Sequence, residues 1–386
     1  MKRASSVYRD LGTTIFEATS RRAAELGAVN LGQGFPDDRG PQEVLQAASE
    51  ALLQGGNQYP SMMGVPELRR ALAAHEARFY GLGFDWQTET LVTSGATEAL
   101  AACLLGLLEP GDEAVLLQPA YDAYAPLIRR AGATPRFVTL RPPDFRLETA
   151  ELERAFGPKT KLVVLNNPLN PLGRVFSESE LDALARLVEA FDAYAVCDEV
   201  YEHLVFDGRR HVPFISRPGM RPRTLKIGSA GKTFSLTGWK VGLVVGPAEL
   251  VRPVSRAHQF LTFTTPPNLQ AAVAFGLGLP DGYFEGLAAE QQRRRDRLAG
   301  GLRSLGLEAL PCEGTYFLNL DIRSAGFEGD DVAFCRQLIE QVGVAAIPVS
   351  AFYEETPVRH LARLCFTKQD AVIDRALERF AAHFRK

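Results

Sequence analysis

The chain has 386 residues, of which 46% are apolar and 23% are charged, a composition typical of an ordinary soluble globular protein. Its formal net charge of −3 gives no electrostatic footprint for nucleic acid or an anionic membrane surface. The most apolar run, at 99–108, has half of the roughly 20 residues that a membrane-spanning helix needs, and the N-terminus lacks the apolar core of a secretion signal. We therefore expect a cytoplasmic protein that binds neither nucleic acid nor membrane.

Cysteine usage supports the same interpretation. The five cysteines are widely spaced and lie mostly among apolar residues (Cys103, Cys197, Cys312, Cys335 and Cys365). Their odd number, and the lack of any CxxC or paired Cys/His spacing, indicate neither a disulfide framework nor a zinc site. We expect reduced thiols, as in a cytoplasmic protein, and no bound metal.

From about residue 88 to 245, short apolar segments alternate with amphipathic ones. The apolar segments predict strands at 90–93, 113–118, 135–140, 161–166, 194–199, 224–229 and 241–246. Several are continuous apolar runs, as is typical of strands buried on both faces of a parallel sheet. Helices are expected after residue 96, at 177–191 and at about 247–260. This alternation predicts an α/β fold with a doubly wound, mostly parallel sheet.

After about residue 285 the pattern changes. We expect a long arginine-rich helix at 285–306, then a strand at 315–322, a helix at 330–343, strands at 344–350 and 360–367, and a helix at 369–384. The basic run RRRDR at 293–297 is typical of a solvated helix face. These elements predict a smaller α+β domain, to which the first 45 or so residues add an arm. We therefore expect a large domain over 46–284 and a small domain formed by 1–45 and 285–386.

Polar residues gather where the predicted strands end, and in an open α/β sheet the binding crevice lies at that edge. After strand 90–93, the small residues of SGATEAL open a helix whose backbone N–H groups form either an anion site or a simple structural turn. After strand 113–118, PAYDAY offers Tyr121 and Tyr124, which suit either the crevice or core packing. After strand 161–166, NNPLNPLG must turn and brings several amides, including that of Asn170, to one strand end.

Ionisable residues follow the next two strands. Asp198 ends an apolar run, and a buried carboxylate requires a cationic or protonated neighbour. Tyr201 comes shortly afterwards, and strand 224–229 leads to Ser229 and to Lys232 and Lys240 in GSAGKTFSLTGWK. Pyridoxal phosphate needs a lysine for its Schiff base, an acid for its ring nitrogen, a face for stacking and a cradle for its phosphate. The residues at successive strand ends together match these needs.

These motifs resemble those of the class I aminotransferases of pyridoxal phosphate fold type I, over essentially the whole chain. SAGKTFSLTGWKVG is similar to the lysine motif of that family, and NLGQGFPD, NQYPSMMGVPELR, NNPLNPLGRVF, CDEVYEHLVFDG and RLCFTK occur in the family's order and spacing. The chain most resembles the branch of kynurenine, glutamine and methionine aminotransferases, which includes cysteine-conjugate β-lyases. The resemblance implies transfer of an amino group from an L-amino acid to a 2-oxo acid.

The resemblance also implies roles for residues around the cofactor ring. Lys232 would form the Schiff base and move the α-proton of the substrate. Asp198 would pair with the ring nitrogen, and Tyr201 and Asn170 would hydrogen-bond the phenolic oxygen. Tyr121 would stack on the ring.

A second set of residues is implied for the phosphate. The backbone of Ala96 and Thr97, with Ser229 and Lys240, would hold it within one subunit. Tyr59 would reach the phosphate of the neighbouring subunit, so the resemblance implies an obligatory homodimer.

For the substrate, Arg363 matches the family's arginine that binds the α-carboxylate, because its planar fork fits a carboxylate in a way that lysine cannot. Asn170 and the backbone of Gly34 would complete this clamp. Ile15 and Phe16, by rough alignment, would line the side-chain pocket and favour apolar or aromatic donors, with methionine, glutamine and kynurenine as further possibilities.

Two departures from the family leave the substrate open. Aspartate-specific bacterial relatives place a basic residue where this chain has Thr97, and the kynurenine and glutamine branch often has a histidine near the position of Thr264. Three other activities remain as alternatives: an aspartate aminotransferase, a β-lyase that acts on cysteine S-conjugates with the same lysine, and an acyl-transferring synthase. A ligand-binding regulator of this fold would need an added DNA-reading segment. Only about thirty residues precede NLGQG, too few for such a segment, so we do not expect a regulator.

Overall fold

The computed structural model describes residues 3–9 and 11–384. A seven-stranded sheet in the order β2-β8-β7-β6-β5-β3-β4 forms the centre of the larger body. Its strands are β2 (Thr90–Thr93), β3 (Glu113–Gln118), β4 (Thr134–Thr139), β5 (Thr160–Asn166), β6 (Tyr194–Asp198), β7 (Thr224–Ser229) and β8 (Gly242–Val245). Strand β8 is antiparallel to its neighbours β2 and β7, and the other adjacent pairs are parallel. The predicted α/β fold with a mostly parallel sheet is confirmed.

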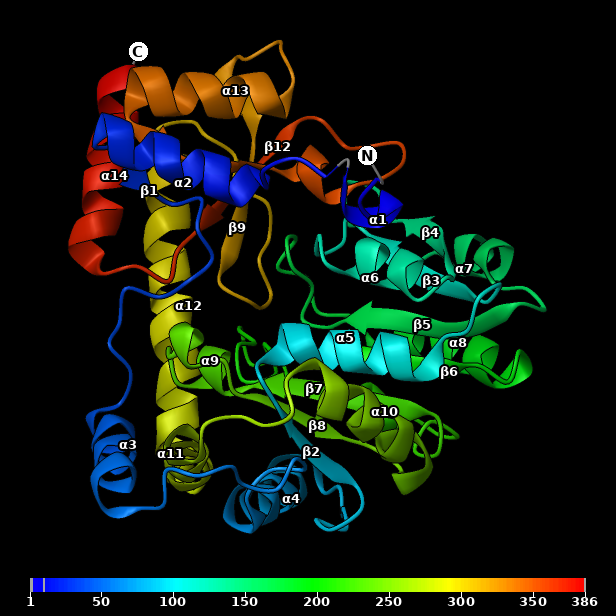
Figure 1. Cartoon of the computed structure of the whole chain (residues 1–386). Coiled ribbons are helices and arrows are strands. Elements are labelled where there is room, and N and C mark those ends of the chain that lie inside the picture. The colour runs from blue at the N-terminus through cyan, green and yellow to red at the C-terminus, as the bar shows by residue number, and fades with distance from the viewer. Residues whose placement is uncertain (1–2, 10, 385–386) are drawn as a thin grey trace.

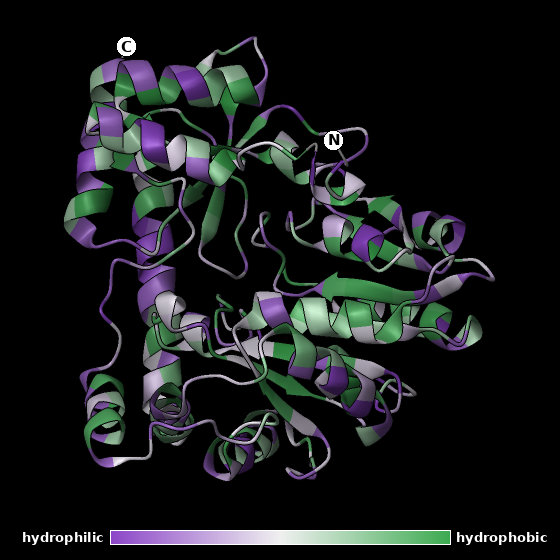
Figure 2. Ribbon diagram, in the orientation of Figure 1, coloured by the Kyte–Doolittle hydropathy of each residue, from purple (hydrophilic) through white to green (hydrophobic). Residues whose placement is uncertain are grey.

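Helices cover both faces of this sheet because successive side chains of each strand point to opposite sides. In β3, for example, Ala114 and Leu116 belong to one apolar core, and Val115 and Leu117 belong to another. The first face packs against α5 (Ala96–Leu107), α6 (Tyr124–Arg130) and α10 (Ala248–Leu261). The second face packs against α7 (Thr149–Ala155), α8 (Glu178–Ala190), α3 (Gln42–Gln54), α4 (Pro66–Tyr80) and α11 (Pro267–Leu277). Figure 2 shows the hydrophobic residues concentrated on the central strands and on α5.

A smaller body lies above the central sheet in Figure 1. Its strands form a three-stranded antiparallel sheet, β11-β12-β9, and a parallel pair, β1-β10. They are β1 (Val29–Asn30), β9 (Phe317–Asp321), β10 (Val344–Ala345), β11 (Ile347–Pro348) and β12 (Leu361–Cys365). The helices around them are α2 (Ile15–Leu26), α13 (Asp331–Gln337) and α14 (Asp370–Phe384), whereas α1 (Ser6–Arg9) lies against α6 of the larger body (Figure 1).

The long helix α12 (Asp281–Ser304) runs from the lower body to the upper one (Figure 1). The proposed domain division at 284/285 therefore falls inside a helix, and the division as a whole stays a prediction. Short helical turns complete the fold: α9 (Ala230–Thr233), η1 (Phe214–Ser216), η2 (Thr237–Trp239), η3 (Ile322–Ala325), η4 (Leu338–Val342) and η5 (Val349–Phe352).

Two elements of the smaller body differ from the sequence prediction. The segment expected as one strand at 344–350 is split, because β10 pairs with β1 whereas β11 pairs with β12 in another sheet. The helix expected at 330–343 is α13 followed by a π-helical turn, η4, which ends at Gly343 with a φ of 76°.

The prediction of a solvated face for RRRDR is wrong for two of its arginines. Arg294 and Arg295 are 7% and 8% exposed. Arg294 binds Asp38 at 2.7 Å, and Arg295 binds Asp207 at 2.6 Å and the carbonyl of Cys312 at 2.7 Å. These two arginines lie on sides of α12 that neighbouring segments cover, and each is stabilised by a carboxylate from a distant part of the chain.

Within residues 3–9 and 11–384, none of the helices combines the length and the apolar character that crossing a membrane requires.

Candidate active site

A cavity of about 410 Å³ lies where the carboxyl ends of the parallel strands face the smaller body. Its lining includes every residue predicted for the cofactor or the substrate except Tyr59 and Ile15, namely Phe16, Gly34, Ala96, Thr97, Tyr121, Asn170, Asp198, Tyr201, Ser229, Lys232, Lys240 and Arg363. Its volume falls in the range of roughly 300–1,000 Å³ that small-molecule sites occupy. Residues from far-apart segments are therefore brought together in one place, although their individual roles remain predictions.

Lys232 enters the cavity from α9, directly after β7. Its Nζ donates a hydrogen bond to the hydroxyl of Tyr316 at 2.6 Å. Burial lowers the pKa of Lys232 to about 8, because the charged ammonium loses hydration there. About a tenth of this lysine is therefore the neutral, nucleophilic amine at pH 7, far more than for a lysine with the ordinary pKa.

Asp198 ends β6 and is 6% exposed. Its Oδ2 accepts a hydrogen bond from the hydroxyl of Tyr124 at 2.6 Å, whereas its Oδ1 is buried without a partner among the described residues. Burial raises the pKa of Asp198 above its usual range. A buried acceptor without a donor is costly, so this carboxylate suits a ligand that brings an N–H group.

The N-terminus of α5 forms the anion-binding part of the cavity. Gly95, the N-cap residue, has a φ of 85° and offers no capping side chain, so the first N–H groups of the helix point toward the cavity end. A Cβ at Gly95 would lie 3.0 Å from Cε of Lys240, which shows how closely this cation approaches the helix start. Together with Ser229 and Thr97, the helix end and Lys240 can hold a phosphate.

Arg363, in β12, is 2% exposed and lies on the opposite wall. Its Nη1 donates to Oδ1 of Asn170 at 3.0 Å and its Nη2 to the carbonyl of Gly32 at 2.9 Å, while Nε finds no partner in the part of the chain that the structure describes. The ring of Phe317 lies 3.9 Å from its Cζ. Burial lowers the pKa of Arg363 to about 10, so the side chain remains a cation at neutral pH.

Asn170 lies in the predicted turn after β5. Its backbone N–H donates to Oδ1 of Asn166 at 2.8 Å, and Nδ2 of Asn166 donates to the carbonyl of Asp198 at 2.8 Å. The asparagines of NNPLNPLG thus tie the turn to the end of β6. This arrangement places Asn170 between the strand ends and Arg363.

Two predicted residues lie elsewhere. Tyr59 is 82% exposed and packs edge-on against Phe263, with ring centroids 5.5 Å apart, so it does not line the cavity of its own chain. Ile15 begins α2 and is half-buried, but its neighbour Phe16, rather than Ile15 itself, lines the cavity.

Sequence reasoning missed Tyr316 and the contact made by Tyr124. Tyr316 precedes β9 and is 1% exposed, so its position looks like core. Its hydroxyl partners, Lys232 and the carbonyl of Gly34, lie 84 and 282 residues away along the chain. Only the polar tip of a buried tyrosine, which needs a partner, could have drawn attention to it.

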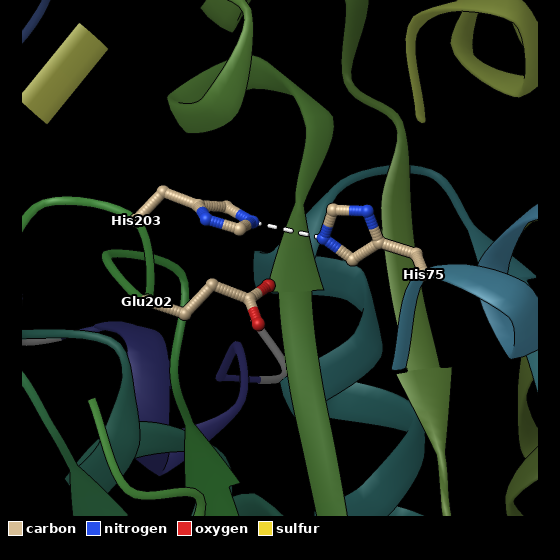
Figure 3. Close-up of side chains that lie close together, drawn as sticks. All are labelled: His75, Glu202 and His203. Carbon is tan, nitrogen blue, oxygen red and sulfur yellow. Dashed lines mark hydrogen bonds between the residues drawn. The ribbon is translucent and has the colours of Figure 1, made fainter. Parts of the chain in front are cut away.

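A second group of ionisable side chains lies buried close to Tyr201 in the chain. Figure 3 shows His75 and His203 joined by a hydrogen bond of 2.8 Å, with the carboxylate of Glu202 below them. Their potential ligand atoms lie within 4.8 Å of one another, a spacing that could hold a metal ion. However, the ammonium of Lys226 binds the same carboxylate at 2.6 Å and Glu76 at 2.5 Å. The cluster is therefore described best as a hydrogen-bonded ion network around Lys226.

The comparisons with known proteins agree over nearly the whole chain. A model of the family described as "Aminotransferase class I and II" matches residues 27–380. The chain is 45% identical over 387 residues to the probable N-succinyldiaminopimelate aminotransferase DapC of Mycobacterium tuberculosis, with 97% of each chain covered. A solved structure of the N-succinyldiaminopimelate aminotransferase from that organism matches with a TM-score of 0.96 at 46% identity, over 98% of this chain and 100% of that one.

Relatives with other substrates in their names are also similar. The methionine aminotransferase of Escherichia coli is 40% identical, with 96% of this chain and 95% of the relative covered. Kynurenine–oxoglutarate transaminase 3 of Mus musculus is 38% identical, with 96% and 88% covered. The resemblance read from the motifs is confirmed at the level of the family and of these relatives.

Proposed function

The chain belongs to the class I and II aminotransferases and is a transaminase, and on that basis we propose that its cavity binds pyridoxal 5′-phosphate and that Lys232 is the reacting amine. The observation that carries the proposal is the meeting of three groups in one cavity. A lysine with a pKa of about 8, an aspartate with a free buried oxygen and a buried arginine are the groups that transamination with this cofactor requires.

The residues present fit this cofactor. None of the described residues donates to Oδ1 of Asp198, and the protonated ring nitrogen would supply a donor. Ala96, Thr97, Ser229 and Lys240 lie together at the start of α5, where a phosphate is stabilised by N–H groups and positive charge. Tyr121 offers a flat face from the turn after β3.

When bound, pyridoxal phosphate supplies an aldehyde carbon that takes up the amino group and a ring that withdraws electrons from the substrate. The other steps belong to the protein. Arg363 binds the α-carboxylate and so orients the Cα–H bond of the donor. The neutral amine of Lys232 removes the α-proton and later returns a proton, as a general base and acid. Asp198, held by Tyr124, would keep the ring nitrogen of the bound cofactor protonated.

We propose donors with apolar, aromatic or methionine-like side chains. The charged residues that line the cavity are Asp198, Lys232, Lys240 and Arg363, and the roles above use all of them. No cation among the described lining residues is left for the second carboxylate of aspartate. Phe16, which lies 5.2 Å from Cζ of Arg363, provides an apolar wall beside the carboxylate clamp.

We also propose a homodimer in which Tyr59 of each copy completes the phosphate site of the other. Support comes from Tyr59, which is 82% exposed and packs against Phe263, itself 42% exposed. Phe260, which precedes Phe263 in the chain, is 86% exposed. Such exposed apolar groups mark interaction surfaces. All five cysteines are free and buried, which supports a location in the reducing cytoplasm.

The test is a panel of donors against several 2-oxo acids, with methionine, phenylalanine, kynurenine, glutamine, aspartate and N-succinyl-diaminopimelate as donors. We expect transfer from methionine and phenylalanine, and Lys232→Ala should abolish it. A kcat/KM for aspartate far above those for methionine and phenylalanine would contradict the substrate proposal. Pyruvate release from a cysteine conjugate without any 2-oxo acid would instead identify a β-lyase. Light scattering should give the mass of two chains.

A further inference from the structure

Tyr316 lies directly against the proposed reacting amine. Its hydroxyl is 2.6 Å from Nζ of Lys232 and 2.7 Å from the carbonyl oxygen of Gly34. Its ring is 1% exposed and is held by two edge-on neighbours, Tyr201 at 5.1 Å and Phe317 at 4.8 Å between centroids. The hydroxyl therefore has a defined position between the lysine and the segment that contains Gly34.

The chemistry of the two partners determines which atom donates in each bond. A carbonyl oxygen can only accept, so the single hydroxyl proton of Tyr316 is committed to Gly34. The phenol oxygen then offers only lone pairs to Lys232, and Nζ must point one of its N–H bonds at Tyr316. The lone pair of the neutral amine is consequently kept away from Tyr316 and on the side of the cavity.

The Gly34 carbonyl is a fixed partner. Its segment is anchored on both sides, because Arg363 donates to the carbonyl of Gly32 at 2.9 Å and Lys368 donates to that of Phe35 at 3.0 Å. A rotating carbonyl would leave the direction of the Tyr316 hydroxyl undefined. Since the neighbouring carbonyls are held, the hydroxyl proton has one direction, and so has the bond from Lys232.

We propose that Tyr316 is a positioning residue for the reaction: it holds Lys232 so that the amine lone pair faces the α-proton of the donor. The inference rests on the proposed function, in which Lys232 is the base. Tyr316 forms no bond with the substrate in this proposal, and it acts on the rate of proton removal through the orientation of Lys232. Loss of its hydroxyl should therefore affect kcat more than the KM of the donor.

The test compares Tyr316→Phe with Tyr353→Phe in the complete enzyme. Tyr353 is a matched control because its half-buried hydroxyl also donates to a carbonyl, that of Leu140 at 3.2 Å, but does not reach the cavity. For Tyr316→Phe we expect kcat to fall about tenfold or more with donor KM within about twofold, since one orienting contact to the base is lost. The kinetic isotope effect with an α-deuterated donor should rise, because proton removal becomes slower than the other steps. Tyr353→Phe should match the wild type.

A second readout does not depend on turnover. In cofactor-free full-length protein, the pH dependence of Lys232 modification by an amine-directed reagent is followed by peptide mass spectrometry. The hydroxyl of Tyr316 stabilises the ammonium form of Lys232. The pH at which modification of Lys232 is half-maximal should therefore fall by about one unit in Tyr316→Phe. If Tyr316→Phe does not fold, Tyr316→His, which offers both an acceptor and a donor, should fold and retain intermediate activity with a raised isotope effect.

The failure of this inference differs from that of the proposed function. Unchanged kcat, isotope effect and midpoint in Tyr316→Phe, with Lys232→Ala inactive, would overturn the role of Tyr316 alone. Activity that persists in Lys232→Ala would overturn the proposed function itself.

Discussion

Lys226→Met should destabilise the protein strongly, although this residue lies outside the cavity. Its ammonium is the cation between two buried carboxylates, Glu76 at 1% and Glu202 at 7% side-chain exposure, at 2.5 and 2.6 Å. Removing one partner of a buried ion pair costs about 3–5 kcal/mol, because the remaining charge is left unpaired. We expect a loss of this size in the free energy of unfolding.

The loss should also depend on pH. Burial raises the pKa of Glu76 to about 7. For a carboxyl whose pKa is raised by folding, the stabilising contribution is present below the unfolded pKa and is lost as the pH rises through the folded one. Without Lys226 the pKa of Glu76 should rise further, so the pH range over which folding must bind a proton at Glu76 becomes wider. The free energy of unfolding of the variant should therefore be lower at pH 8 than at pH 6.

Urea titrations followed by circular dichroism at both pH values measure this. Lys161→Met is the matched control, since Lys161 is half-buried in β5, contacts the ring of Tyr194 and forms no ion pair with any of the described residues. Lys161→Met should lower the free energy of unfolding by no more than about 1 kcal/mol. The double variant Lys226→Met/Glu76→Gln should regain stability, because one unpaired charge is removed. Equal stability of Lys226→Met and Lys161→Met, or no gain in the double variant, would refute the reasoning.

Three further predictions concern the cavity. In steady-state assays, Arg363→Lys should lower kcat/KM for the donor by about 10- to 100-fold, mainly through KM, because a two-donor charged contact worth roughly 1.5–3 kcal/mol is lost. The control is Arg359→Lys, a change at an exposed neighbour, which should leave kcat/KM unchanged. Equal effects of the two substitutions would argue against the carboxylate clamp. The rate of α-proton removal should rise about tenfold per pH unit below a pH of about 8 and level off above it, because only the unprotonated Lys232 is a base; a flat pre-steady-state profile from pH 6 to 9 would contradict this. Tyr124→Phe should weaken cofactor affinity about tenfold in an equilibrium titration, because Asp198 loses a hydrogen-bond donor at 2.6 Å and the pKa of Asp198 then rises. Unchanged affinity would show that this contact is dispensable.

The sequence allowed most of the central sheet to be predicted because several of its strands are continuous apolar runs bounded by turns. The ends of those strands then had to meet at one edge, which is why residues as distant as Asn170, Asp198 and Lys232 could be placed in one site. The split of 344–350 could not be predicted in this way. Its short strands, on either side of Ala346, are assigned to different sheets by partners elsewhere in the chain.

Partners at long range also explain the other omissions. Arg294 looked solvated because the carboxylate of Asp38 that it binds lies 256 residues away. Tyr316 looked like core because its polar contacts depend on how the small body meets the large one. The role predicted for Tyr59 requires a second copy of the chain, and it stays a prediction for a side chain that is 82% exposed in one copy.

Lys232, and not Lys240, is the lysine that we propose to carry the cofactor. Reduction of the purified enzyme with borohydride, followed by peptide mapping, tests it most directly. We predict the mass of reduced pyridoxal phosphate on Lys232 and on no other lysine, and no labelled peptide in Lys232→Ala. Label on Lys240, or a labelled lysine that persists in Lys232→Ala, would contradict the account.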